Sequence, residues 1–131
     1  MVTASDRAVV AFSLSGGNAH DAPEGERLLS KVTRSAEHVY IIMDRAYAGY
    51  KMRAKAMESG YIPVVPPKRN RKEPWEYDTE RYKQRNEIER FFLRLKRFRK
   101  IFTRYDKLDV MFCGFICFAI IIDSIISVNR L

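Results

Sequence analysis

The sequence is short of the residues that build disulfide frameworks and zinc sites. It contains two cysteines and two histidines among 131 residues. Cys113 and Cys117 lie four positions apart in an apolar run, without a second pair or a nearby histidine, so we expect free thiols in a reducing compartment. His20 and His38 stand apart from any catalytic pattern, and a structural role is expected for each. No basic segment followed by an apolar one opens the chain, so no signal peptide is expected.

Other familiar signatures are missing as well. The pattern G-x-S-x-G of nucleophile elbows does not occur, and Gly16-Gly17 lacks the spacing of a phosphate-binding loop. Internal repeats and low-complexity tracts are absent from the sequence. With 131 residues, 47% hydrophobic and 31% charged, the composition is that of one globular domain.

Acidic residues are outnumbered, 16 against 24 lysines and arginines, which leaves a net charge of +8. The surplus is local, because residues 81–107 contain eleven basic and three acidic residues, whereas the charges of the remaining residues cancel. A concentrated positive charge indicates a polyanionic partner. Nucleic acid is the preferred candidate, and an anionic membrane is the next. A solvated helix face without a partner would show the same pattern.

The first third of the chain predicts a strand and a helix. Residues 7–14 are dense in Val, Ala, Phe and Leu and precede a turn signal at 15–18, which predicts a strand with Asp6 in the turn before it. Asp21 is expected to cap a helix that continues over 25–32, because a proline and an acid follow it.

The middle of the chain predicts a strand, a helix and a second strand. Residues 38–43 form a short apolar run typical of a central parallel strand. Residues 48–59 contain helix formers and stop at Gly60, a C-cap signal. Residues 61–65 predict the second strand, and Pro63 within it suggests an edge position. This order implies a right-handed crossover and a parallel sheet.

A polar, turn-rich loop is expected over residues 66–78. Its four positive charges are expected to contact a phosphate backbone. They are Lys68, Arg69, Arg71 and Lys72. Trp75 and Tyr77 in the same loop would stack on nucleic-acid bases or, as the alternative, pack half-buried against the protein.

A long basic helix is expected over residues 79–107, capped by Asp78 or Thr79. Its apolar residues fall within one arc at 100° per residue and predict a buried face: Ile88, Phe91, Phe92, Leu95 and Phe102. A second arc, at the rim of that face, holds Tyr82, Arg85, Glu89 and Lys96. The remaining side is basic and is expected to bind nucleic acid through Arg90, Arg94 and Arg97.

Residues 108–128 predict an apolar C-terminal helix. The uncharged run of residues 110–122 has thirteen residues, which is short of the ~20 that a bilayer requires, and Asp109 and Asp123 close it on both sides. A buried helix of a soluble protein is therefore the preferred interpretation, with a membrane segment as the alternative.

Two carboxylates have positions that suit metal chemistry. Asp44 directly follows the apolar strand, and the carboxyl ends of parallel strands are where open α/β sheets place their sites. Glu89 lies at the rim of the buried helix face. If the two converge, their hard oxygens would suit Mg²⁺ or Mn²⁺, and a pair of such ions stabilises the attacking and leaving oxygens of phosphodiester cleavage. An acid after a strand is, just as often, a helix N-cap.

The spacing on the long helix is specific. Tyr82, Arg85, Glu89 and Lys96 match Y-(2)-R-(3)-E-(6)-K, and in this the chain resembles bacterial insertion-sequence transposases of the DDE superfamily. Further segments resemble that family in the same order: 13–29, 43–47, 62–72 and 85–108. The resemblance implies an α/β fold of the ribonuclease H-like (DDE integrase/transposase) class, a central mixed sheet with flanking helices.

The resemblance also implies an activity. Family members use an Asp, Asp, Glu triad with two Mg²⁺ ions to activate water, nick DNA at the element ends and direct the freed 3′-hydroxyl at target DNA. Asp44 matches the second Asp and Glu89 the Glu, which implies metal-ligand roles for both. Tyr82, Arg85 and Lys96 would support the centre by holding phosphate or orienting Glu89. The implied partners are DNA and, in oligomers, further copies or a full-length transposase, with no membrane. The implied location is the cytoplasm, at the nucleoid.

One feature departs from the family pattern. The first Asp of the family lies on a strand upstream of the segment that matches residues 13–29, and Asp6 falls where the family has a turn, so it does not match. The first catalytic strand and the DNA-end-binding region are expected to be absent, which makes the domain N-terminally truncated. We therefore expect the chain alone to be inactive in DNA cleavage. A non-catalytic DNA-binding remnant and a small membrane-associated basic protein are the alternatives.

Overall fold

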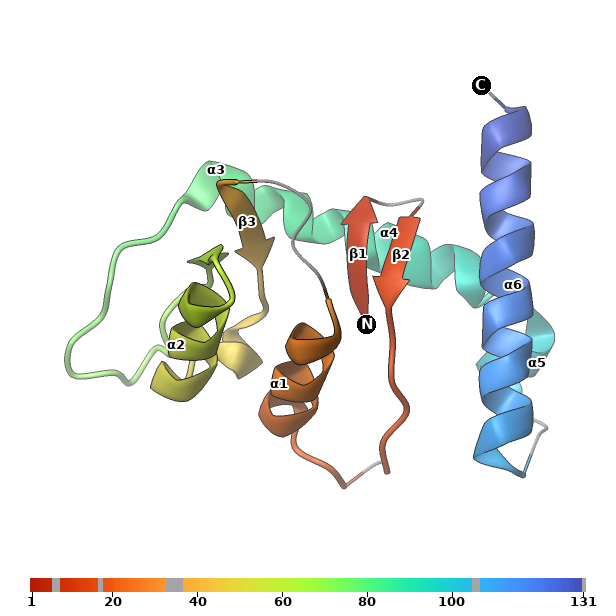
Figure 1. Cartoon of the computed structure of the whole chain (residues 1–131), viewed down its shortest axis with the longest axis horizontal. Helices are drawn as coiled ribbons and strands as arrows, with labels where there is room; N and C mark the ends of the chain where they lie inside the picture. Colours follow the sequence, from red (N-terminus) through yellow and green to blue (C-terminus); the bar gives the residue numbers. More distant parts are fainter. Residues whose placement is uncertain (6–7, 17, 33–36, 105–106, 131) are drawn as a thin grey trace. The chain divides into compact units, whose positions relative to one another are not determined.

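The computed structural model describes residues 1–5, 8–16, 18–32, 37–104 and 107–130. The turn expected at Asp6 lies outside these residues, and so does the side chain of Phe102. Figure 1 shows the helices and strands of the chain. The chain divides into two compact units. The first unit comprises Met1–Leu14 and Asn86–Leu131, and the second comprises Ser15–Arg85.

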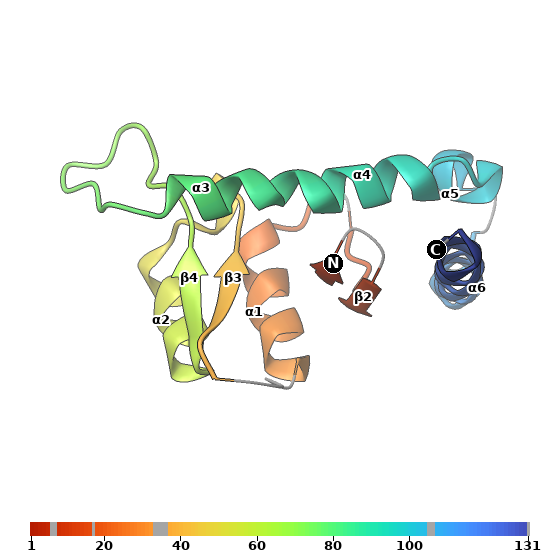
Figure 2. The same cartoon turned by 90° about the horizontal axis from the view of Figure 1, so that it is seen from above.

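The second unit contains the predicted strand, helix and strand. β3 (Val39–Ile42) and β4 (Tyr61–Val64) pair in parallel, and α2 (Tyr50–Glu58) lies between them in sequence. α1 (Asp21–Lys31) contacts α2, and Figure 2 shows both helices beside the strand pair. The buried residues that fill this core are Leu29, Met43, Ala48, Met52, Ala56, Tyr61 and Val65. The predicted parallel pairing is thus confirmed.

The ends of these elements follow the sequence signals, with one exception. Gly60 follows α2 with a φ of 81°, a left-handed conformation that glycine adopts without strain. Pro63 lies in β4, which pairs with β3 on one side only. Asp21 does not cap α1 as expected, because the helix already begins at Asp21 and His20 is its N-cap. As an acid in the first turn, Asp21 still complements the positive end of the helix dipole.

The first unit has a separate small sheet and core. β1 (Val2–Ser5) and β2 (Ala8–Ala11) pair antiparallel. β2 lies within the strand predicted over residues 7–14, whereas the sequence does not predict β1, whose four residues carry little apolar periodicity. The buried centre of this core consists of Phe91, Leu95 and Ala119.

The described strands form two separate sheets of two strands each, where one central mixed sheet was expected. β1 and β2 belong to the first unit, and β3 and β4 belong to the second. A two-stranded sheet buries little apolar area by itself. Helices supply all three buried residues at the centre of the first unit's core, whereas in the second unit α1 and α2 supply three of the seven, and β4 and the connecting segments supply the others.

The single helix expected over residues 79–107 is divided. α3 (Thr79–Tyr82) is followed by a 3₁₀ turn, η2 (Lys83–Arg85), and by α4 (Asn86–Leu95), and a bend separates α4 from α5 (Arg99–Thr103). Five of the seven residues from 94 to 100 are basic. Because α4 ends at Leu95, the charges of Lys96 and Arg97 lie at the negative end of that helix, and the bend separates these charges from those of α5.

The predicted helix faces change accordingly. Phe91 and Leu95 are buried as expected, but Phe92 is 40% exposed. Lys96 follows the last residue of α4 and Arg85 lies on the 3₁₀ turn, so the four signature residues do not share one regular helical face. The prediction of a continuous face is therefore wrong. The prediction of the cap is confirmed, because Asp78 accepts a hydrogen bond at the start of α3.

α6 (Asp109–Asn129) is helical over the apolar C-terminal segment, but it is not the buried helix that was expected. Its buried residues form one stripe: Phe112, Ile116, Ala119 and Asp123. Large apolar side chains elsewhere on it are exposed, among them Val110 at 81% and Phe118 at 56%. With 21 residues and 22% of its most apolar window buried, α6 has the length and composition to cross a membrane, although core helices of soluble proteins meet the same criterion. α6 continues beyond the uncharged run, because Asp123 is buried within the helix and does not end the helix.

Candidate functional site

Asp44 lies directly after β3, at the carboxyl end of the parallel pair. Its side chain is 54% exposed. Its Oδ1 accepts a hydrogen bond of 3.4 Å from the backbone N–H of Ala46, and Asp44 is the N-cap of a short 3₁₀ turn, η1 (Arg45–Tyr47). Asp44 thus has the capping role that the sequence offers as one alternative, and its carboxylate is still accessible to solvent.

Arg85 brings a positive charge to this carboxylate. Its Nη1 lies 3.3 Å from Oδ2 of Asp44, although the two residues are 41 positions apart in sequence. The Arg85 side chain is 31% exposed, and its guanidinium carbon lies 5.9 Å from the ring centre of Tyr82. Three of the predicted catalytic residues, Asp44, Tyr82 and Arg85, are thus close together in the second unit.

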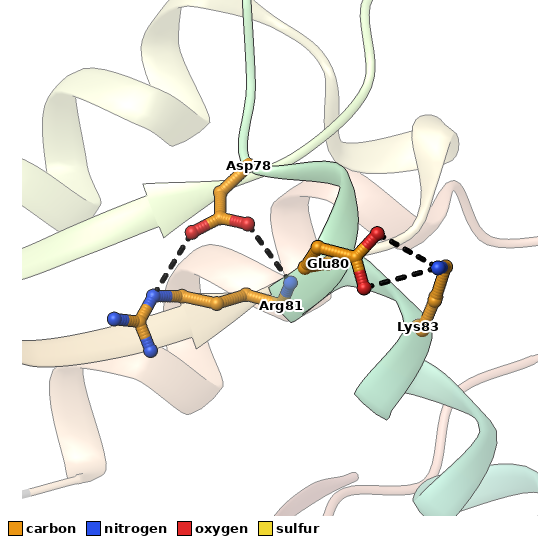
Figure 3. A network of polar contacts seen from close by, with 4 residues as sticks. All are labelled: Asp78, Glu80, Arg81 and Lys83. Carbon is orange, nitrogen blue, oxygen red and sulfur yellow. Dashed lines mark hydrogen bonds and ion pairs between the residues drawn. The ribbon is translucent and has the colours of Figure 1, made fainter.

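The start of α3 is attached to β3. Oδ1 of Asp78 accepts a hydrogen bond of 2.9 Å from the backbone N–H of Arg81, and its Oδ2 lies 3.0 Å from Nε of Arg81 (Figure 3). In the same turn, Nζ of Lys83 lies 2.8 Å from Oε1 of Glu80. The Arg81 guanidinium carbon also lies 3.9 Å from the ring centre of Tyr40 on β3. These contacts hold the segment that carries the Arg and Tyr of the signature against the strand that precedes the carboxylate.

Tyr47 lies in the 3₁₀ turn that Asp44 caps and has a raised pKa. Burial raises the pKa of its hydroxyl, and the negative charges of Asp21 and Asp44 raise this pKa further. Its ring packs against the core of the second unit. Tyr47 therefore remains neutral at physiological pH and adds no negative charge next to Asp44.

Glu89 and Lys96 belong to the first unit. Glu89 is an exposed residue of α4. Lys96 lies in the bend after α4 and lines a pocket of about 350 Å³ whose walls are mainly apolar and include Phe92 and Ile116. The structure thus divides the five predicted catalytic residues between the units, three in the second and two in the first.

The oxygen donors can be compared with what a magnesium ion requires. Asp44 and Glu89 are exposed carboxylates, and Mg²⁺ binds through one or two such groups together with water and substrate phosphate. Among the residues that the structure describes, no group of three or more His, Cys, Asp or Glu side chains is arranged as a metal site. The two contacts of Asp44, at 3.3 and 3.4 Å, are long and leave lone pairs of its carboxylate for a cation. The donor chemistry of each acid therefore fits Mg²⁺.

The cations predicted to bind nucleic acid fall in two groups. The first lies in the loop 66–78, which contains no helix or strand, and all four are exposed: Lys68, Arg69, Arg71 and Lys72. In the second, Arg90 and Arg97 are exposed. Arg94 differs, because its Nε donates to both carboxylate oxygens of Asp123 on α6, at 3.1 and 3.2 Å. With a side chain only 22% exposed, Arg94 has a structural contact that the sequence does not predict.

The loop 66–78 also makes contacts that the sequence does not predict. Trp75 is half-buried, and its Nε1–H donates to the carbonyl oxygen of Val65 at 2.8 Å. The guanidinium carbon of Arg53 on α2 lies 3.9 Å from the Trp75 ring centre. Tyr77 packs edge-on against Tyr82. Both aromatic residues are thus engaged within the protein, and Arg53, at an ordinary helix position, carries no sequence signal for its contact with the loop.

The comparison with protein families gives a match that covers most of the chain. The family model described as transposase DDE domain matches residues 1–122, which include residues of both units. The searches against curated proteins and solved structures returned no significant match. The family implies a ribonuclease H-like α/β fold, a soluble cytoplasmic protein that acts on DNA in transposition, and general use of divalent metal ions. The mixed helices and small sheets agree with an α/β class. The chain therefore belongs to the family of transposase DDE domains.

Proposed function

We propose that this chain is part of the catalytic domain of a bacterial insertion-sequence transposase. It would bind element-end and target DNA and take part in metal-dependent cleavage and strand transfer. The observation that carries the proposal is the contact between Asp44 and Arg85, because it joins an exposed carboxylate after a strand to the Arg of the Y-(2)-R-(3)-E-(6)-K spacing. The family match over residues 1–122 supports it.

Each signature residue has a role that suits its chemistry. Asp44 and Glu89 would hold Mg²⁺ or Mn²⁺ through carboxylate oxygens. When bound, the metal supplies Lewis-acid stabilisation of the attacking and leaving oxygens. Arg85 orients Asp44 through their contact, and the ring of Tyr82 lies beside the Arg85 guanidinium. Lys96 offers an ammonium group to a DNA phosphate.

Loss of either carboxylate should weaken binding of a divalent metal. We expect Asp44→Asn and Glu89→Gln each to weaken Mn²⁺ binding about tenfold, since each removes an anionic ligand. The measurement is loss of the free-ion electron paramagnetic resonance signal with duplex DNA present. Glu58→Gln is the matched control, because Glu58 is an exposed acid at the end of α2 in the second unit and does not match the signature. Unchanged Mn²⁺ binding in both variants would contradict the ligand roles.

The purified chain is expected to bind duplex DNA and not to cut it. Its 131 residues contain matches to two of the three acids of the family, Asp44 and Glu89. Binding should fall steeply with salt, because phosphate contacts release counterions. The test incubates the chain with a duplex that carries an insertion-sequence end and Mg²⁺, and follows binding by anisotropy and nicks on a denaturing gel. Failure to bind any duplex would refute the proposed function, whereas nicking would refute the expected inactivity alone.

The basic surface proposed for DNA consists of the exposed cations of the loop 66–78 and, on or after α4, Arg90 and Arg97. Arg94 was predicted to belong to it, and its contact with Asp123 limits its reach toward a phosphate. A protein with this surface but no activity would act as a DNA-binding component at the nucleoid, alone or in mixed oligomers with a full-length transposase. Duplex binding without cleavage favours that form of the proposal.

A membrane-associated basic protein is the second candidate, and the exposed apolar sides of α6 are the observation that favours it. Against it, Asp123 and Asp109 lie within α6, and the family match extends to residue 122, well into that helix. Cell lysis without detergent separates the two candidates. Recovery of the chain in the soluble fraction would remove the membrane candidate.

A further inference from the structure

Trp75 holds two guanidinium groups at once. The guanidinium carbons of Arg53 and Arg71 lie 3.9 and 4.6 Å from the centre of the Trp75 ring. The two carbons are therefore at most about 8.5 Å apart, the sum of those distances, which is close to the Debye length of about 8 Å at physiological ionic strength. At a separation of no more than roughly one Debye length, part of the repulsion between the two positive charges remains unscreened.

The protein does not neutralise this pair of charges. Neither Arg53 nor Arg71 forms an ion pair with a carboxylate in the part of the chain that the structure describes. Glu73 and Glu76, the acids nearest to Trp75 in sequence, are exposed and pair with neither arginine. Other cations of the second unit do have carboxylate partners: Arg27, Lys51, Arg81, Lys83 and Arg85. The two arginines on Trp75 are therefore the kind of cation pair that an external anion would stabilise.

Both guanidinium groups are also held in place. The Trp75 indole is anchored by its hydrogen bond to Val65 and packs against the core of the second unit. Nη1 of Arg71 donates to the carbonyl oxygen of Ala48 at 3.4 Å, and Arg53 belongs to the regular helix α2. A planar guanidinium that is already stacked on a ring loses less rotational freedom on binding than a free side chain does. The arrangement is thus preorganised.

We propose that Arg53 and Arg71, positioned by Trp75, form a binding site for a phosphate group of nucleic acid. A guanidinium carries five N–H donors in a planar group that matches the oxygens of a phosphate, and Arg71 uses one of its nitrogens for the bond to Ala48. The exposed loop cations next to it extend the positive surface along which consecutive phosphates of a strand would lie: Lys68, Arg69 and Lys72. The nature of the ligand rests on the proposed function. The inference adds Arg53, which lies outside both the loop and the signature, and it makes Trp75 a positioning residue.

The chain contains one tryptophan, so its fluorescence reports on this site directly. The full chain is titrated with a labelled duplex, and Trp75 emission and duplex anisotropy are followed together at several salt concentrations. We expect the two signals to change in parallel. Arg53→Gln and Arg71→Gln should each weaken binding about three- to tenfold at about 150 mM salt and lower the slope of log affinity against log salt by about 1. Arg27→Gln is the matched control, because it removes the same charge from α1 in the same unit and should leave both signals nearly unchanged.

Two results would overturn the inference in distinguishable ways. In the first, the chain binds the duplex without a change in Trp75 emission, and Arg53→Gln and Arg71→Gln bind the duplex as tightly as Arg27→Gln does. This result would refute the phosphate site but not the proposed function. A second titration uses pyrophosphate. Emission that responds to pyrophosphate in a chain that binds no duplex would show that the ligand is a free phosphate compound, and it would count against the proposed function as well.

The stacked geometry is tested separately from the charge. Arg53→Lys and Arg71→Lys keep the positive charges but replace the planar groups that lie on the ring. We expect these variants to keep the salt slope and to lose most of the Trp75 emission response. An emission response equal to that of the parent chain would overturn the positioning role of Trp75. Circular dichroism of every variant confirms that a change in binding does not come from unfolding.

Discussion

Replacing Asp123 by alanine is expected to lower the free energy of unfolding by about 3 kcal/mol, because it takes the carboxylate from a largely buried ion pair. The side chains of Arg94 and Asp123 are only 22% and 11% exposed, and Nε of Arg94 donates to both carboxylate oxygens. The pair joins α4 to α6 beside the buried core of the first unit. Chemical denaturation followed by circular dichroism measures the loss, since both partners lie on helices.

Two variants on the same elements show whether burial is the cause. Asp109 also lies on α6 and pairs with Arg104, but its side chain is 77% exposed, so Asp109→Ala should cost less than about 1 kcal/mol. The double variant Arg94→Met with Asp123→Leu should remain within about 1 kcal/mol of the parent chain, because the desolvation cost disappears together with the attraction. If Asp123→Ala and Asp109→Ala cost the same, the pair does not hold the two helices together.

Neutralising three loop cations is expected to weaken binding of duplex DNA by about ten- to a hundredfold at physiological salt. The variant replaces Lys68, Arg69 and Lys72 by glutamine, and all three side chains are exposed in the loop 66–78. Each phosphate contact contributes about 0.9 to the slope of log affinity against log salt, so this slope should fall by about 3. Anisotropy of a labelled duplex between about 50 and 200 mM salt measures both quantities.

The control for this experiment removes three positive charges from another surface of the second unit. Arg27, Lys31 and Lys51 lie on α1 and α2, and Arg27 and Lys51 pair with glutamates there. Their replacement by glutamine changes the net charge by the same amount, so it tests long-range attraction without the loop. We expect little change in the slope. A fall as large as that of the loop variant would mean that net charge, and not the loop, determines binding.

The elements that the sequence predicts correctly are those with local signals. β3 is a short apolar run, α2 ends at a glycine that adopts a left-handed conformation, and Asp78 caps α3. In each case the residues that determine the structure are neighbours in sequence, so patterns of hydrophobicity, capping and turn chemistry suffice. The same reasoning places Asp44 at the end of its strand and offers the capping role that the structure shows, whereas the role of Asp44 as a metal ligand stays a prediction.

The contacts that the sequence does not predict join residues far apart. A helical wheel assigns Arg94 to the solvent side, because it contains no information about which face of α4 meets α6. Asp123 likewise marks the end of an uncharged run in sequence, yet in the fold it lies buried against Arg94, 29 positions away. α6 as a whole is apolar enough to be buried all round, but the first unit covers one stripe of it. Its exposed sides depend on what it packs against, and this is not a local property.

The path of the chain through the first unit has a consequence for biosynthesis. The second unit, Ser15–Arg85, is continuous in sequence and can complete its core while the ribosome is still making the rest. The strand pair of β1 and β2 is made before the second unit, but β1 contacts α4, so the pair waits for residues made much later. During that interval Val9 lacks the core against which it finally packs, and the strand edges are open to association with other nascent chains. β1 and β2 are therefore made before the second unit but complete their packing after it.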